Sequence, residues 1–287
     1  MIITGIYLSG NAIQPENDYV SAIIDKHQRL NRMESPRLII IGGSNIAFGI
    51  DSERIQNEID IPVVNLGLHA GLGLDFMIQQ LKYVVRKSDV VIVVPEYHLS
   101  MNGDYKLKKH VSQYFPFANQ FFHKNLFEEA RLFLEQTREN LKKKFKRQMP
   151  PNSFEWRNSV YSRASFNQYG DIIGHLKMKS REIMDPPHIN KNWEGIYALN
   201  SLSEFIKDKG ASIFVSYPPF PESFYFERKN AIDNFEENLK RDLRLKILGN
   251  SSDFVFPDSL FFDTVYHLND DGRRIRTDAL IKFIKEN

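Results

Sequence analysis

Short apolar runs bounded by turn residues recur along the chain and alternate with amphipathic stretches. Apolar runs of this length without polar alternation are typical of parallel strands that are covered on both faces. The runs lie at 37–43, 61–67, 89–97, 211–219 and 253–258, and the helical patterns lie at 51–58, 73–86, 192–209, 221–248 and 270–285. This alternation predicts a three-layer α/β/α domain with a doubly wound parallel sheet of about five strands.

One long segment interrupts the alternation. Residues 99–190 are rich in Phe, Tyr, Lys and Arg, and they predict an insertion that is helical from about 125 to 146. We expect residues 1–36 to form an N-terminal extension and residues 37–287 to form the domain. The basic run RENLKKKFKR at 138–147 is most simply a solvated helix face, and contact with an envelope surface or a polyanion is the alternative.

Composition excludes several classes of function. The 287 residues are 42% hydrophobic, which fits one large domain, and the net charge of +2 does not indicate a nucleic-acid partner. The absence of cysteine excludes disulfides and thiolate nucleophiles, and no apolar run is long enough to predict a membrane span. The apolar residues 1–10 predict either a first strand, with a cytoplasmic protein, or the remnant of a trimmed anchor, with a location in the bacterial cell envelope.

A Gly-Gly-Ser turn follows the first apolar run, at residues 42–44. Such a turn can expose N–H groups to a phosphate, or it can present a serine hydroxyl as a nucleophile. The P-loop and dinucleotide-binding patterns are absent, so we expect no cofactor and favour Ser44 as a nucleophile. A serine nucleophile needs a histidine base and an acid that orients it. Asp263 precedes His267 by four residues and is the candidate acid.

Three blocks in this order resemble the SGNH (GDSL-like) hydrolase family, in particular its branch linked to polysaccharide O-acyl modification. They are GGSN at 42–45, VVNLGLHAGLG at 63–73 and DTVYHLNDDG at 263–272. The resemblance spans about residues 37–285 and implies a flavodoxin-like SGNH fold with the partly helical insertion. It also implies that Ser44 is the nucleophile, His267 the base and Asp263 its orienting acid. The late block has one residue more than is usual in the family, and Asp258 is the nearest substitute acid.

The resemblance further implies an oxyanion hole built from the N–H group of Ser44 and that of a glycine. Gly71 is the first choice, with one residue more than the usual spacing after Asn65, and Gly67 is the second. The Asn of the family's third block is missing from VVPEYH at 93–98, where Tyr97 either donates through its hydroxyl or belongs to the core. We expect the following residues to contact the substrate: Glu96, His98, Asn167 and Tyr217.

Polar residues lie between aromatic residues at 161–176. This arrangement suits a surface that contacts carbohydrate or, equally, a surface loop that is held by its own hydrogen bonds. A metal site built from Glu96, His98, Asp263 and His267 is an alternative use of the same crevice, but no tight ligand spacing supports it, and we expect no metal.

The sequence therefore predicts a serine esterase or O-acyltransferase that acts on an acylated hydroxyl of a small molecule or glycan. By analogy with the family, the expected substrate is an O-acetylated carbohydrate. The alternative is a non-catalytic carbohydrate-binding module on the same fold.

Overall fold

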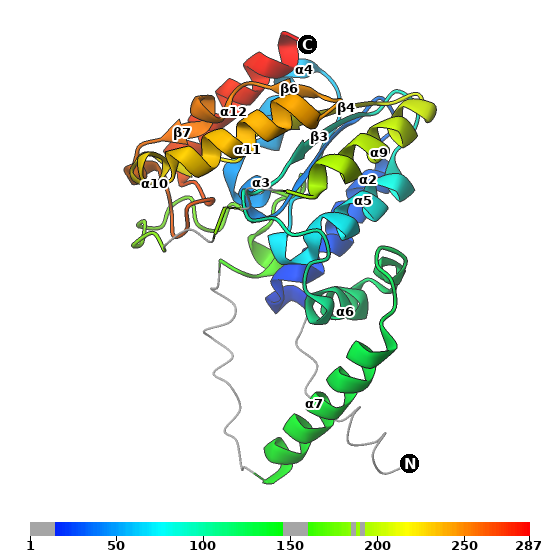
Figure 1. Cartoon of the computed structure of the whole chain (residues 1–287). Coiled ribbons are helices and arrows are strands. Elements are labelled where there is room, and N and C mark those ends of the chain that lie inside the picture. Colours follow the sequence, from blue (N-terminus) through cyan, green and yellow to red (C-terminus); the bar gives the residue numbers. More distant parts are fainter. Residues whose placement is uncertain (1–14, 146–159, 185–187, 190–192) are drawn as a thin grey trace.

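The computed structural model describes residues 15–145, 160–184, 188–189 and 193–287, so the apolar residues 1–10 lie outside the described part. A parallel sheet of five strands forms its centre, in the order β2-β1-β3-β4-β6 (Figure 1). These strands are β1 (Leu38–Gly42), β2 (Val63–Asn65), β3 (Val90–Val94), β4 (Ser212–Ser216) and β6 (Lys246–Leu248). The α/β prediction is confirmed, and the strand order reverses between β1 and β3, where open α/β sheets bind their ligands.

Two layers of helices cover the sheet (Figure 1). Ile39 and Ile41 of β1 face one layer, and Leu38 and Ile40 face the other, because successive side chains of a strand point to opposite faces. The first layer holds α2 (Ile23–Arg32), α5 (Gly73–Val84), α9 (Gly195–Asp208) and α11 (Lys229–Asp242), and the second holds α3 (Ser44–Gly49), α4 (Ser52–Ile59) and α12 (Asp270–Lys285). Helix α2, from the segment expected to be an extension, therefore packs on the sheet.

The prediction for the fifth strand was wrong. The pattern at 221–248 contains two shorter helices, α10 (Glu222–Glu227) and α11, and then β6, which is the strand at the edge of the sheet. Residues 243–247 alternate between apolar and polar, as expected for an edge strand that is half exposed. The run at 253–258 contains β7 (Val255–Phe256), which pairs with β5 (Phe220–Pro221) in a separate small sheet.

The insertion contributes α6 (Tyr105–Tyr114) and α7 (Leu126–Phe145), and the second helix confirms the prediction for 125–146. Helix α7 projects from the body of the molecule as an arm (Figure 1). The described segment 160–184 returns to the carboxyl ends of the strands, where Ile172 N–H donates to the Ala47 carbonyl of α3 at 2.7 Å. No helix in the described ranges is both long and apolar enough to cross a membrane.

Candidate active site

Ser44 is the first residue of α3, directly beyond the carboxyl end of β1. Gly43 precedes it in a turn with no room for a side chain, because a Cβ there would lie 2.2 Å from Glu96 Oε1 and 2.7 Å from the Ala70 nitrogen. The Ser44 side chain is half-buried, and its hydroxyl makes no hydrogen bond within the described part of the chain. The turn therefore presents an uncommitted hydroxyl at the reversal point of the sheet.

His267 and Asp263 form a direct pair, with 2.8 Å between Nδ1 and Oδ1, and both residues are buried. A tight loop closed by the bridge between Phe261 and Leu268 turns the two side chains toward each other. Burial tends to raise the pKa of Asp263, but hydrogen bonds from His267 and Tyr161 outweigh burial and leave that pKa below its usual value. Asp258 instead accepts from the Ser223 N–H at 3.1 Å, so Asp263 is the partner of His267.

Phe48 connects this pair to the helix that carries Ser44. Its ring lies one turn after Ser44 on α3 and stacks flat on the His267 imidazole, with 3.9 Å between centroids and 8° between planes. Because Asp263 occupies Nδ1, the Nε2 atom of His267 remains for other chemistry. Ser44 and His267 form no hydrogen bond with each other in this structure.

Tyr161 is a member of this site that the sequence did not identify. Its hydroxyl donates to Asp263 Oδ2 at 2.6 Å and lies 3.2 Å from His267 Nδ1. Burial and the neighbouring Asp263 raise the pKa of Tyr161 well above its usual value, so the phenol stays a neutral donor. The residue belongs to the insertion, and no local signal in the sequence connects it with a block a hundred residues away.

Glu96 lies against the backbone of the Ser44 turn. Its two carboxylate oxygens accept from the N–H groups of Gly43 and Asn45, each at 3.2 Å, and the residue is 1% exposed. Arg276 supports the same turn by donating to the carbonyl of Asn45 at 2.7 Å and to its Oδ1 at 2.9 Å. Burial lowers the pKa of Arg276 to about 9, with Glu96 acting in the opposite direction. These hydrogen bonds from Glu96 and Arg276 hold the Ser44 turn in place.

The glycines expected to supply an oxyanion donor are otherwise engaged. The Gly71 N–H donates to His69 Nδ1 at 2.9 Å, and the Gly67 N–H donates to Asn65 Oδ1 at 2.8 Å. Ala70, in the short helix η3 (Ala70–Leu72), stands at the usual family spacing after Asn65, and its nitrogen faces Gly43. The Ala70 N–H has no hydrogen bond to any described residue. A backbone donor does not depend on its side chain, so Ala70 fits this place.

Two further histidines, His69 and His98, lie near Glu96, and His69 also lies near His267. His69 is exposed, and His98 stacks on Tyr266 with 5.3 Å between ring centroids. Partial burial lowers the pKa of His69, and nearby Glu96 opposes that effect. Among the described residues, no three His, Cys, Asp or Glu side chains are arranged to hold a metal ion, so the metal alternative gains no support.

The oxyanion-hole candidate Tyr97 and the predicted contact residue Tyr217 are buried, and the predicted contact residue Asn167 is half-buried. Tyr97 is 1% exposed and packs edge-on between Phe220 and Phe235, with centroids at 5.4 and 5.3 Å, which favours the core interpretation. Tyr217 belongs to the same apolar cluster. Asn167 Oδ1 accepts from the N–H groups of Tyr169 and Asp171 at 2.9 Å, as in a well-tied loop. Substrate contacts by Tyr217 and Asn167 stay predictions.

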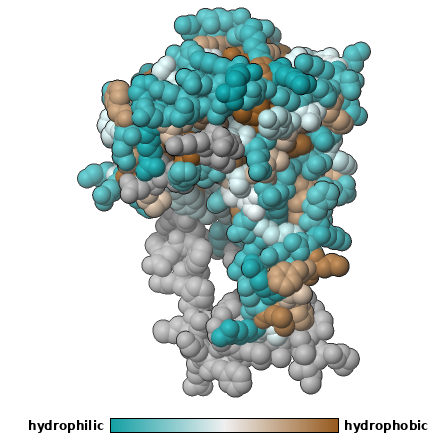
Figure 2. Space-filling view, viewed as in Figure 1, coloured by the Kyte–Doolittle hydropathy of each residue, from teal (hydrophilic) through white to brown (hydrophobic). Residues whose placement is uncertain are grey.

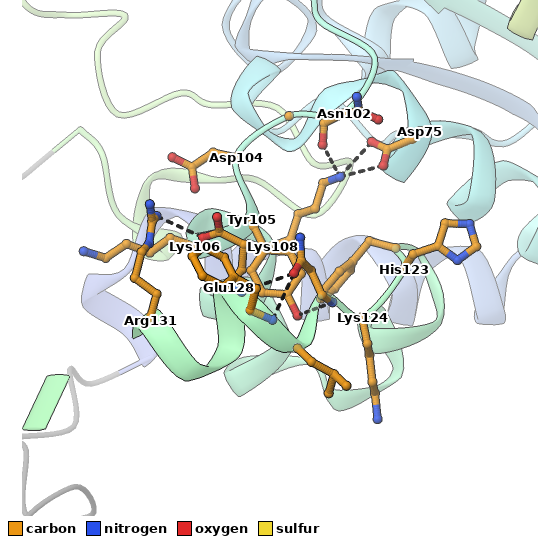
Figure 3. A pocket seen from close by; sticks show the side chains of 15 residues that line it. Asp75, Asn102, Asp104, Tyr105, Lys106, Lys108, His123, Lys124, Glu128 and Arg131 are labelled. Carbon is orange, nitrogen blue, oxygen red and sulfur yellow. Dashed lines mark hydrogen bonds and ion pairs between the residues drawn. The ribbon is translucent and has the colours of Figure 1, made fainter. Parts of the chain in front are cut away.

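A separate cavity of about 900 Å³ lies between loop 102–104, α6 and the start of α7. Figure 3 shows Lys108 at its edge, reaching toward Asp75 and Asn102. Ser44, Asp263 and His267 do not line this cavity.

No protein-family model matches the chain, and no curated protein is significantly similar to it. The resemblance to SGNH hydrolases therefore rests on the three sequence blocks alone. The activity is accordingly a proposal.

Proposed function

We propose that this protein is a serine-dependent acyl-transfer enzyme, an esterase or O-acyltransferase that acts on an acylated hydroxyl. The observation that carries the proposal is the hydrogen bond between Asp263 and His267, stacked on the helix that Ser44 begins. In the proposed reaction, Nε2 of His267 takes the proton of Ser44 Oγ as Oγ attacks the acyl carbonyl. The imidazolium then protonates the leaving alkoxide, and water or an acceptor hydroxyl releases the acyl group from Ser44.

Charge on the tetrahedral intermediate requires donors aimed at its oxygen. The N–H groups of Ser44 and Ala70 support this role, since both lie at the Gly43 turn and neither has a partner in the described chain. We therefore assign to Ala70 the role that the sequence suggested for Gly71. Glu96 is a positioning residue in this scheme, because its carboxylate is directed at the neighbouring N–H groups of Gly43 and Asn45.

The substrate proposed is an acyl ester of a carbohydrate hydroxyl. Support comes from the crevice itself, where the 40% exposed ring of Tyr161 and the exposed His69 stand near His267. Aromatic rings offer a face on which sugars stack, while imidazoles donate and accept hydrogen bonds. The family analogy for O-acetyl glycans gives the acyl group, and it remains an analogy.

One observation favours a second candidate, a non-catalytic carbohydrate-binding module. Glu96 follows the strand after which the family supplies an oxyanion-hole Asn, and a negative charge near the intermediate would oppose its formation. The two candidates differ in whether Ser44 reacts.

A covalent probe separates the candidates. We expect a fluorophosphonate to label the wild-type chain, and an aryl acetate to be hydrolysed, with both activities lost in Ser44→Ala. The matched control is Ser201→Ala on α9, an exposed serine whose hydroxyl donates to the Tyr197 carbonyl of the same helix. The free energy of unfolding of each variant should lie within about 1 kcal/mol of the wild-type value. A folded wild-type protein that neither reacts with the probe nor turns over ester, but binds acetylated glycan, would replace the enzyme proposal with the binding module.

A further inference from the structure

Residues 175–184 run beside the loop that carries Asp263 and His267. Contacts along the length of the segment tie it to that loop: His175 Nε2 donates to the Leu268 carbonyl at 2.8 Å, the Arg181 N–H donates to the Phe262 carbonyl at 2.6 Å, and Met184 pairs with Thr264 in a parallel bridge. A segment that is held at several points keeps its side chains in defined places. Residues 175–184 therefore form a rim of the candidate active site.

The rim carries basic side chains that have no acidic partner. Lys177, Lys179 and Arg181 are exposed, and none of them forms an ion pair with a residue that the structure describes. Glu182 is the single acidic residue of the segment, and it too is exposed without an ion pair in the described ranges. The rim thus presents an excess of positive charge that the described part of the protein does not neutralise.

Arg181 is held next to the acid of the candidate triad. Its guanidinium carbon lies 5.7 Å from the centroid of the Phe262 ring, which attracts a cation through its face, and Phe262 directly precedes Asp263. Burial raises the pKa of Asp263, and hydrogen bonds from His267 and Tyr161 lower it. The positive charge of Arg181 adds to that lowering, as expected for a guanidinium that lies near the carboxylate.

The acidic groups of the crevice are already engaged by other donors. Asp263 accepts from His267 and Tyr161, and Glu96 accepts from two backbone N–H groups of the neighbouring turn. The N–H donors of the Arg181 guanidinium therefore remain free for a group from outside the described chain. A guanidinium matches the two oxygens of a carboxylate or a phosphate with parallel hydrogen bonds.

Apolar side chains lie beside these charges. Met178 and Met184 are 40% and 66% exposed on the same segment. They lower the local dielectric around a bound anion and so strengthen its attraction to the rim. The apolar surface of α7 does not take part, because Figure 2 shows it on the projecting lower part of the molecule, where Figure 1 draws that helix.

We propose that the substrate carries an anionic group near its acylated hydroxyl and that Arg181 selects for it. The guanidinium donates to a carboxylate or a phosphate of the substrate, while Lys177 and Lys179 attract the same charge at longer range. The inference rests on the proposed acyl-transfer function and narrows its substrate class to esters of acidic glycans. Arg181 is a specificity-determining residue in this scheme and takes no part in the chemical step.

A matched pair of aryl acetates tests the selection. 4-Acetoxybenzoate carries a negative charge, and 4-acetoxybenzamide is a neutral ester of nearly the same shape. We expect wild-type kcat/KM to be about tenfold higher for the benzoate, and added salt should reduce the difference. Arg181→Gln should remove the preference and retain the rate on the benzamide, because glutamine keeps the backbone N–H that holds the rim to Phe262.

Two additions sharpen the test. 4-Acetoxyphenyl phosphate, compared with the benzoate, shows which of the two anions the rim prefers. The matched control variant is Arg244→Gln, which changes a side chain that is 76% exposed before the amino end of β6, at the opposite edge of the sheet. This variant should keep the wild-type preference. Circular dichroism verifies that both variants are folded.

The possible failures have different meanings. Equal wild-type kcat/KM for the charged and neutral esters, or a preference that Arg181→Gln retains, would overturn the inference and leave the acyl-transfer proposal intact. An equal fall on every ester in Arg181→Gln would also overturn it, since Arg181 would then act only through Asp263. Hydrolysis of none of the esters would overturn the acyl-transfer function and the inference with it.

Discussion

The crevice around Ser44 and the α7 arm are built in opposite ways. The crevice joins segments that are far apart in the chain, and its polar side chains Asp263, His267 and Glu96 are at most 8% exposed and hydrogen-bonded to one another or to backbone. The arm is one continuous helix on which Leu126, Phe127 and Leu134 are 79%, 76% and 67% exposed. A buried polar group without a partner is costly, so the crevice tolerates few geometries. The exposed apolar side chains of the arm bury little surface on folding.

The largest expected effect concerns the acid that orients His267. Asp263→Asn keeps the size of the side chain but removes the carboxylate that holds Nδ1. We expect the turnover of an aryl acetate to fall by about 10⁴, the loss seen when a catalytic triad is altered in this way. Steady-state kinetics measures it, with Asp258→Asn as the control that should retain near wild-type turnover. A loss below tenfold for Asp263→Asn would leave a dyad of Ser44 and His267.

The second prediction tests the rigidity of the crevice. Asp171 is fully buried, and its carboxylate accepts from Ser52, from Asn65 and, at 3.2 Å, from Arg273. Asp171→Ala leaves these donors without their acceptor, so the free energy of unfolding should fall by about 3 to 5 kcal/mol. Urea denaturation measures it. The control is Asp233→Ala, which breaks an exposed pair with Lys229 on α11 and should cost less than about 1 kcal/mol.

A smaller effect is expected at Tyr161. Tyr161→Phe removes the donor to Asp263 Oδ2, and we expect turnover to fall by about tenfold. A tenfold fall corresponds to a loss of about 1.4 kcal/mol of transition-state stabilisation. Without that donor, Asp263 loses one of the hydrogen bonds that lower its pKa, so the acid limb of the pH–rate profile should move to higher pH.

The pH profile distinguishes this role from simple packing. Tyr161 loses only its hydroxyl in the variant and keeps the ring that lies 5.6 Å from Phe48. A lower rate with an unchanged profile would show that the hydroxyl contributes to packing or solvation and not to the charge of Asp263.

The smallest effect is expected on the arm. Leu134→Ser should change the free energy of unfolding by less than about 0.5 kcal/mol, because a side chain that is 67% exposed buries little surface on folding. The urea measurement used for Asp171→Ala gives the comparison directly. A loss of 2 kcal/mol or more, on the scale of core truncations, would mean that α7 packs against the body in solution.

Elements with a strong local pattern could be predicted from the sequence. Helix α12 spans Asp270–Lys285, as predicted, and Asn269 caps it by accepting from the Gly272 N–H. Four of the five strands of the main sheet lie within the apolar runs expected for them. The fifth did not, because β6 is a short strand of three residues at the sheet edge, and the weak alternation around it was absorbed into the neighbouring helical pattern.

The candidate site also contains some features that short segments predict and others that only tertiary packing decides. The sequence alone determined that Ser44 follows a buried strand and that Asp263 stands four residues from His267, since both are properties of short segments. Tertiary packing decided that Tyr161 reaches Asp263 and that Ala70, rather than Gly71, faces the Gly43 turn. It also decided that Glu96 turns toward Ser44 while the adjacent Tyr97 turns into the core. Residues next to each other at a strand end diverge to opposite sides, and only the long-range contacts that bury one side chain and hydrogen-bond the other select between them.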